Sequence, residues 1–285
     1  MTEQLLDSNR LAYSGLALPA REQARISRTW GWLSYAEYTW AGMRAYLRTI
    51  LFATFGVPLL YLMAMGVGLG SLIDRGVGTI DGVGYLVFVG PALLISSVVQ
   101  ESMAEFTYPV MGGFKWHRFY YAAQASPLQP WQIVFGQAFA VASRFAFQAT
   151  VFWLLLLAFG VTREPLSVLM IPIATLAALS FGLPVMAYAA TLEEEGAQFA
   201  FVQRFVVNPM FLFAGTFYPL ATMPGYLQWI GWVSPIWHGT QLARIVGYGM
   251  ENPAWLTLVH VLFLVATAAA GYLAAVRFFE RRLTR

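Results

Sequence analysis

Long apolar stretches are the feature that most constrains how this chain can fold. Six of them, each about 20 residues or longer, lie at 49–72, 84–103, 133–161, 166–191, 197–217 and 255–276. At about 1.5 Å of rise per residue, a helix of that length crosses a hydrocarbon core of about 30 Å. Only 11% of the residues are charged, against about 25% in soluble domains. The sequence therefore predicts an all-α polytopic membrane protein with six transmembrane helices.

The basic residues are unevenly divided between the two ends of these stretches. An even number of spans places both termini on one side. The segments on that side hold Arg10, Arg21, Arg25, Arg28, Arg44, Arg48, Lys115, Arg118, Arg277, Arg281, Arg282 and Arg285. The segments on the other side hold Arg75, Arg163 and Arg244. The positive-inside rule then predicts a multi-pass protein of the cytoplasmic (inner) membrane with both termini in the cytosol.

Two segments precede the first span. Residues 1–26 are polar and mixed, which predicts a flexible cytosolic tail. Residues 27–48 place aromatic and charged side chains on different helical faces, with Trp32 and Trp40 on one and Glu37 and Arg44 on the other. This pattern predicts an amphipathic helix in the headgroup layer, although a plain lead-in to the first span is the alternative. Residues 49–285 would then form the membrane domain.

The loop between the second and third spans is rich in basic and aromatic residues. Gly112-Gly113 predicts a turn, Ser126-Pro127 predicts a helix end, and a short helix is expected over 114–123. This helix would carry Phe114, Lys115, Trp116, Arg118, Phe119, Tyr120 and Tyr121. It is either an ordinary interfacial helix or a lever held by a cytosolic partner, because aromatic and arginine side chains commonly anchor interfaces.

The segment 218–254, between the last two spans, is apolar but interrupted by prolines. Such a sequence favours short re-entrant helices that dip into the outer leaflet. Irregular backbone at that depth is tolerated only where it packs against protein or lines a cavity.

Charged residues within or beside the spans need partners, because an unpaired charge is costly at membrane depth. We expect Arg144 to form a structural ion pair with Glu101 or Glu105, which end the second span on the same side. Contact with a substrate is the alternative role. Arg204 is expected to extend toward the cytosolic surface or to meet the acidic run at 193–195.

Several kinds of chemistry are not expected from this sequence. It has no cysteine and no Gly-x-x-x-x-Gly-Lys-Ser/Thr phosphate loop, and its only lysine is Lys115. The histidines His117, His238 and His260 are far apart in sequence, so surface or packing roles are expected and no metal site. The basic residues flank membrane spans, and a nucleic-acid partner is therefore not expected.

A family resemblance rests on several proline and glycine motifs. Residues 208–220 read Asn-Pro-Met-Phe-Leu-Phe-Ala-Gly-Thr-Phe-Tyr-Pro-Leu, and Met223-Pro224 and Ser234-Pro235 follow. Together with Pro-Leu-Leu-Tyr at 58–61, the glycines at 66 and 70, and Ser-Pro-Leu at 126–128, they resemble type-2 ABC exporter permeases. The resemblance runs over about 44–279 and is greatest to the permease of the nodulation lipo-oligosaccharide exporter. The motif positions are Asn208, Pro209, Gly215, Pro219, Pro224 and Pro235.

The resemblance implies a six-span half transporter that pairs with a second copy of itself around a central pathway. Residues 114–123 would be the coupling helix, docked on one of two separate ABC ATPase subunits, and 27–48 would be the interface helix. The chain would be non-catalytic and bind no cofactor, while the ATPase would bind ATP and Mg²⁺.

The implied substrate is a lipo-oligosaccharide or another lipid-linked glycan, exported among membrane lipids. A drug or lipid efflux permease of the same family is the alternative. An ion-coupled secondary transporter is less consistent with the sequence, because no internal repeat is found. An intramembrane transferase is also less consistent, because the acidic residues lie at span boundaries and in loops.

Overall fold

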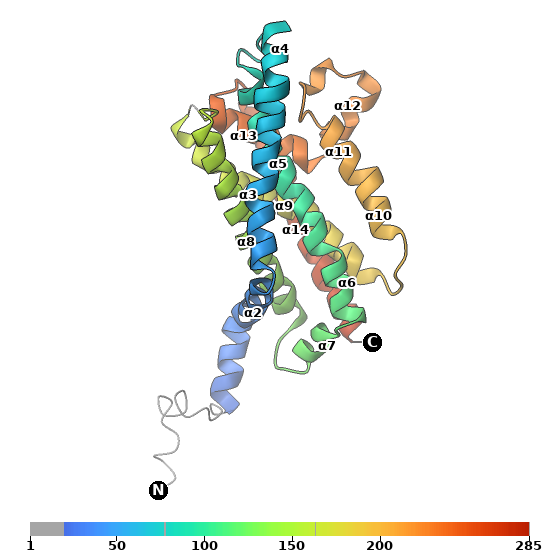
Figure 1. Ribbon diagram of the computed structural model, residues 1–285. Coiled ribbons are helices and arrows are strands. Elements are labelled where there is room, and N and C mark those ends of the chain that lie inside the picture. Colours follow the sequence, from blue (N-terminus) through green and yellow to red (C-terminus); the bar gives the residue numbers. More distant parts are fainter. Residues whose placement is uncertain (1–19, 77, 163, 285) are drawn as a thin grey trace.

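The chain folds into a bundle of helices that run along one long axis (Figure 1). The computed structural model describes residues 20–76, 78–162 and 164–284. Within those ranges the β-pairing consists of one isolated bridge between Ile80 and Val83. Five helical segments there are long and apolar enough to cross a membrane. The prediction of an all-helical polytopic membrane protein is therefore confirmed.

The five spans include three with a change of helix type or a break. They are, in order, α3 (Leu47–Tyr61) with the π-helix η2 (Leu62–Gly70) and α4 (Ser71–Gly76); α5 (Tyr85–Phe106) with α6 (Tyr108–Lys115); α8 (Pro130–Ala158); the 3₁₀ turn η3 (Pro165–Leu169) with α9 (Met170–Thr191); and α14 (Ala254–Leu283).

The predicted span at 197–217 is shorter in the structure than the sequence suggests. It consists of α10 (Gln198–Val202), a π-helical turn η4 (Gln203–Val207) and α11 (Asn208–Phe213). The helix ends because Ala214 leaves the helical conformation and Gly215 adopts a φ of 75°. At 1.5 Å per residue the whole element is about 24 Å long, less than the hydrocarbon core. The described residues thus contain five spans of full length and this shorter sixth element.

The second and fourth spans form the centre of the bundle. The apolar part of the second span is 83% buried, compared with 19% and 22% for the first and last spans. α9 packs against α5, α8 and α14. Close approach of α9 and α14 depends on Gly271, where an added Cβ would lie 2.3 Å from Pro184 Cδ. Small residues at such crossings let helix backbones pack tightly in a membrane.

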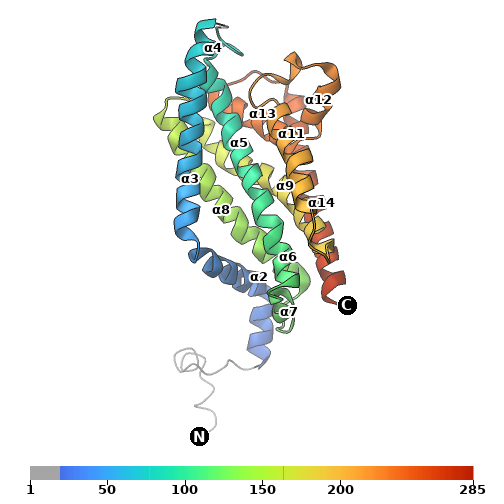
Figure 2. The same ribbon diagram turned by 45° about the vertical axis from the view of Figure 1, so that its right-hand side comes forward.

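The helix before the first span, α2 (Ala20–Arg44), turns away from the axis of α3 (Figure 2). It begins earlier than the predicted 27–48. It also ends earlier, because the N–H groups of Ala45 and Tyr46 donate to carbonyls three residues back and so form a turn. Tyr35 and Ala36 are buried, whereas Glu37 and Arg44 are exposed. Of the predicted tail 1–26, residues 1–19 lie outside the described residues, as does Arg163, and 20–26 are helical.

The opposite end of the bundle carries the two short helices α12 (Gly225–Trp232) and α13 (Pro235–Tyr248). A 3₁₀ turn, η5 (Leu220–Thr222), precedes them. The Ser234 hydroxyl caps α13 by accepting a hydrogen bond from the Ile236 N–H at 3.1 Å, and Pro235 occupies its first turn. α13 packs against α5, α9 and α14 and is buried along most of its length.

Candidate functional site

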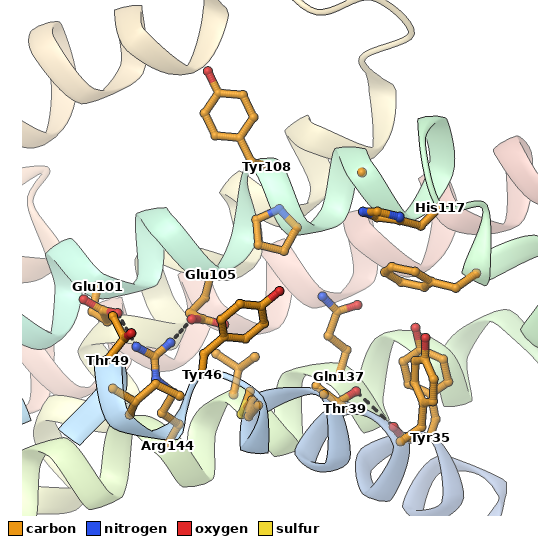
Figure 3. Close-up of a pocket in the computed structure, with 18 of the residues that line it drawn as sticks. Tyr35, Thr39, Tyr46, Thr49, Glu101, Glu105, Tyr108, His117, Gln137 and Arg144 are labelled. Carbon is orange, nitrogen blue, oxygen red and sulfur yellow. Dashed lines mark hydrogen bonds and ion pairs between the residues drawn. The ribbon is translucent and has the colours of Figure 1, made fainter. Parts of the chain in front are cut away.

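A cavity of about 650 Å³ lies between α2, the α5–α6 span and α8, at the end of the bundle that carries α7. Its wall combines aromatic rings with hydroxyl, amide and carboxylate groups (Figure 3). α2 and the start of α3 supply one side, and α5 and α6 supply the other. Helix α2 therefore closes a hollow that the spans alone would leave open.

A cluster of three charged side chains forms one end of this cavity. Arg144 on α8 makes ion pairs with both Glu101 and Glu105 on α5, through its two terminal nitrogens (Figure 3). The two glutamates are four residues apart, so the helix presents them on one face. The contact that the sequence predicts for Arg144 is present, and it involves both candidate partners. The cluster holds two carboxylates and one guanidinium.

Buried polar groups hold the far wall of the cavity in place. The Tyr120 hydroxyl donates a hydrogen bond to Gln137 Oε1 at 2.5 Å, and the Tyr35 ring stacks 6.4 Å from the Tyr120 ring. Burial, together with the neighbouring Tyr120 and Tyr38 hydroxyls, raises the pKa of Tyr35. These tyrosines therefore stay neutral and serve as hydroxyl donors and acceptors.

A second cavity of about 250 Å³ lies farther along the same helices. It shares Glu101 and Arg144 with the first cavity, so the ion pair separates the two hollows. Its other polar lining residues come from four different helices: Thr54, Ser97, Gln100, Gln148 and Gln203. Polar side chains within spans are costly unless they pair or line a hydrated space, so this grouping forms a second polar hollow between the helices.

The segment expected to be one coupling helix over 114–123 is divided in the structure. α6 ends at Lys115, the backbone turns through Arg118 with a φ of 51°, and α7 (Phe119–Gln124) follows. The predicted turn at Gly112-Gly113 is wrong, because both glycines are buried inside α6. A Cβ on Gly113 would lie 2.3 Å from the Tyr120 ring. Gly113 therefore lets α7 fold back against α6.

The residues predicted for this helix divide into a buried and an exposed group. Phe114 and Tyr120 are buried, and the ring of each lies 4.8 Å from the Phe279 ring of α14. Phe119 is half-buried. The remaining members are exposed and surround the turn between α6 and α7: Lys115, Trp116, Arg118 and Tyr121. We call this group the turn surface.

The predicted face of the N-terminal helix packs on α8. The Trp32 ring makes edge contacts with Phe135 and Phe139 at 5.1 and 5.3 Å between centroids. The Trp40 indole N–H donates a hydrogen bond to Ser143 Oγ at 2.8 Å. α8 accommodates this contact because it has glycine at position 136, where a Cβ would lie 2.3 Å from the Trp32 carbonyl oxygen.

The proline and glycine motif positions mark helix boundaries. Asn208 and Pro209 start α11, and Gly215 supplies the positive φ that ends the element. Pro219, Pro224 and Pro235 lie at the starts of η5, α12 and α13 respectively.

Arg244 on α13 is buried, although its place between the last two spans predicts an outer-loop charge. Its side chain is 1% exposed. Nε donates to the Phe88 carbonyl at 3.2 Å, Nη2 donates to the Gly215 carbonyl at 2.9 Å, and the guanidinium lies 3.7 Å from the Phe88 ring centroid. It is the single charge in the apolar stretch 235–248, and that pattern could have identified it.

The other singled-out residues have structural surroundings of their own. His238 and His260 are buried and contact each other, with 2.8 Å between their Nδ1 atoms, although they are far apart in sequence. Arg204 lies on the exposed surface of η4. Among the described residues, no group of three or more potential metal ligands comes together.

Comparison with known proteins places this architecture in a family. The profile of the ABC-2 type transporter family matches residues 34–248, from within α2 to the end of α13. The chain belongs to the ABC-2 type transporter family. Proteins of this family are transmembrane subunits that are generally non-catalytic.

Similar proteins narrow the assignment. Nodulation protein J of Rhizobium meliloti (strain 1021) is 23% identical, covering 89% of this chain and 94% of that protein. Nodulation protein J of Bradyrhizobium diazoefficiens is 24% identical, covering 91% and 96%. The probable multidrug ABC transporter permease YbhR of Escherichia coli (strain K12) is 28% identical over 55% of this chain and 43% of its own length. Within the family, the similarity to Nodulation protein J extends over most of both chains, in agreement with the resemblance seen in the sequence.

Proposed function

We propose that this chain is the permease subunit of an ATP-driven exporter that moves an amphiphile out of the cytosol or the inner leaflet. The substrate we propose is a lipo-oligosaccharide or another lipid-linked glycan. The observation that carries the proposal is the family match across residues 34–248, which includes both cavities and the turn surface. The chain itself catalyses no reaction, and ATP and Mg²⁺ bind to two separate ATPase subunits.

The proposed topology places the α7 end of the bundle in the cytosol, with both termini. The uneven distribution of basic residues supports this orientation. The shorter element formed by α10, η4 and α11 then supplies the sixth crossing. Its length of about 24 Å requires local thinning of the bilayer or a covered end, and α12, which contacts α11, lies at that end.

A homodimer is the proposed assembly. Several large apolar side chains of the first span and the shorter sixth element are exposed, among them Phe52, Leu60, Phe201 and Phe205. Part of these faces would contact lipid, and part would contact a second copy of the chain. Purification of a monomer that transports without an ATPase would contradict the assembly.

The turn surface is the proposed docking site for the ATPase. Its aromatic and basic side chains are of the types that anchor protein interfaces. Phe114 of α6 and Tyr120 of α7 pack against Phe279 of α14, which fixes both helices on either side of the turn. A displacement of the turn by the ATPase would therefore be transmitted to α14 through these ring contacts, and to α5 through α6, which continues the same span. The interface helix α2 contacts α8, and it provides a second route to the same cavity.

The test replaces Trp116 and Arg118 by alanine and measures co-purification with the ATPase, ATP hydrolysis and export. Trp116 is 47% exposed, and because its ring also lines the cavity, co-purification with the ATPase is the measurement that tests docking. We expect docking to weaken by about 2 kcal/mol or more, which is roughly 30-fold in affinity. Trp229→Ala is the matched control, because Trp229 is 61% exposed on α12 at the other end of the bundle. Wild-type docking and transport in the double variant would remove the turn surface from the proposal.

A drug or lipid efflux permease is the second candidate, favoured by the similarity to the probable multidrug permease YbhR. An aromatic cavity with a few polar groups suits many amphiphiles. Mass spectrometry of lipids that co-purify with the permease–ATPase complex distinguishes the two. Enrichment of glycan-bearing lipids supports the first candidate, and their absence alongside transport of drug-like cations supports the second.

A further inference from the structure

We infer that the cavity between α2, α5–α6 and α8 binds the uncharged sugar headgroup of an amphiphile before export. The inference deepens the proposed export function and rests on it. It assigns a binding site to a space within one protomer, bounded by the interface helix and the ion-pair cluster of Arg144. It also assigns a charge preference to that site.

The size and lining of the cavity suit a sugar headgroup. Its volume of about 650 Å³ lies within the range of about 300–1,000 Å³ for small-molecule sites. Sugars present both C–H faces, which pack against aromatic rings, and hydroxyls, which need paired donors and acceptors. The lining supplies rings from Tyr38, Trp116 and Phe119 and hydrogen-bonding groups from Thr39 and Gln137. The Thr39 hydroxyl donates to the Tyr35 carbonyl and Gln137 Oε1 accepts from Tyr120, so the Thr39 oxygen remains as an acceptor and the Gln137 amide N–H groups remain as donors for a sugar hydroxyl.

The charge balance of the cavity argues against an anionic headgroup. Glu101 and Glu105 share the single guanidinium of Arg144, so the cluster carries one excess negative charge. His117 also lines the cavity, at its α6 end. In a partly buried site, where charges interact more strongly than in water, a phosphate group would be repelled. The headgroups of anionic phospholipids, the most abundant competing amphiphiles with a negative charge, would thus be rejected, and an uncharged glycan would be admitted.

The cavity opens where an amphiphile of the inner leaflet can enter. Tyr46, in the bend between α2 and α3, is 69% exposed and lines the cavity beside Glu105 (Figure 3). Beyond this bend, α3 presents exposed apolar side chains such as Phe52 and Phe55. A headgroup in the cavity would therefore leave its acyl chain against α3. The second cavity, on the other side of the ion pair, provides polar groups that the headgroup would contact after it leaves the first cavity.

The test fills the cavity at Gly42, which lines it and has no atom within 4 Å of an added Cβ. An added Cβ there meets no neighbour, and the ring of Gly42→Phe is the group meant to fill the space. Gly225→Phe is the matched control, because Gly225 is equally open but starts α12 at the other end. Thr49→Phe, on an exposed position that also lines the cavity, is a second filling variant. Full-length protein in phosphatidylcholine nanodiscs is titrated with fluorescent alkyl maltoside, alkyl phosphate and alkyl trimethylammonium of equal chain length.

We expect the maltoside to bind wild type and Gly225→Phe with equal affinity. Its affinity for both filling variants should be at least tenfold weaker. The alkyl phosphate should bind wild type at least tenfold more weakly than the maltoside. Glu105→Gln, which removes the excess charge, should narrow that difference. Maltoside affinity that is unchanged in both filling variants would overturn the site. Equal binding of phosphate, or preferred binding of the ammonium probe, would overturn the assigned headgroup chemistry.

Association with the ATPase is measured on the same samples. Loss of maltoside binding in a filling variant that still binds the ATPase supports the headgroup site. If wild-type protein binds the maltoside but associates with no ATPase, the proposed export function fails and the binding site stands. The two proposals can thus fail separately.

Discussion

Replacing the buried arginine Arg244 by methionine tests what holds the outer helices onto the bundle. Methionine has a similar length and fills much of the same space, but it has no hydrogen-bond donor. The substitution would leave the Phe88 and Gly215 carbonyls without the donors that they have at 3.2 and 2.9 Å. It would also remove the guanidinium from the Phe88 ring, 3.7 Å away. Burial lowers the pKa of Arg244 to about 10, so the side chain is charged at neutral pH.

The magnitude follows from these contacts. The Gly215 carbonyl, left buried without its donor, costs about 1–3 kcal/mol, and the Phe88 carbonyl, which lies within α5, loses one hydrogen bond worth about 1 kcal/mol. The lost cation–π contact costs up to about 2 kcal/mol. The variant regains part of this, because a charge no longer has to be desolvated. We expect a net loss of about 3 kcal/mol. Arg244→Lys should lose less, since it keeps the charge but cannot serve two carbonyls with one planar group.

The assay is thermal unfolding of the purified protein in detergent, with hydrogen exchange to locate the change. A loss of about 3 kcal/mol corresponds to a fall in Tm of roughly 6–12 °C. Amides around Gly215 should exchange faster, because the turn loses its attachment to α13. Arg75→Met is the control, since Arg75 is an exposed arginine on α4. A wild-type Tm together with unchanged exchange at the turn would refute the reasoning.

Three further predictions concern other buried contacts. Arg144→Leu should lower folded yield, because it leaves Glu101 and Glu105 unpaired, and adding Gln at both positions should partly restore the yield; normal yield in the single variant would argue against a structural role. Gly215→Ala should lower the free energy of unfolding by about 1–2 kcal/mol, because the φ of 75° disfavours a side chain, and an unchanged free energy of unfolding would show that the turn relaxes. Gly136→Ala should displace α2, since the added Cβ would lie 2.3 Å from an α2 carbonyl; disulfide cross-linking between cysteines placed on α2 and α8 should then become less efficient, whereas unaltered cross-linking would contradict the close contact.

The sequence alone determined the class of protein and most of its spans. Span positions depend on the length of apolar runs, because a backbone in lipid must satisfy its hydrogen bonds internally, and a long apolar helix does so. This local property can be read from consecutive residues. The ion pair of Arg144 also followed from the sequence, because a charge at membrane depth needs a partner and the suitable acidic residues were few.

Local pattern failed where the chain folds back on itself. Gly112-Gly113 resembles a turn signal, but both glycines lie inside α6, and Gly113 is needed there because the Tyr120 ring packs against it. Tyr120 itself resembles an exposed interface residue in sequence, yet Phe114, Gln137 and Phe279 enclose it. Neither result depends on neighbouring residues alone. Both depend on how α7 is placed against α6, α8 and α14.

The tertiary structure alone decided which polar groups meet. Arg244 finds carbonyls on α5 and in the Gly215 turn, more than 100 and nearly 30 residues away in sequence respectively. His238 and His260 meet across two helices, and α2 closes a cavity over the ion pair. Hydrophobic burial is non-directional and roughly proportional to area, so the sequence pattern suffices to predict that a helix is buried. Hydrogen bonds and cavities require specific distances between distant segments, and packing of the whole bundle sets those distances.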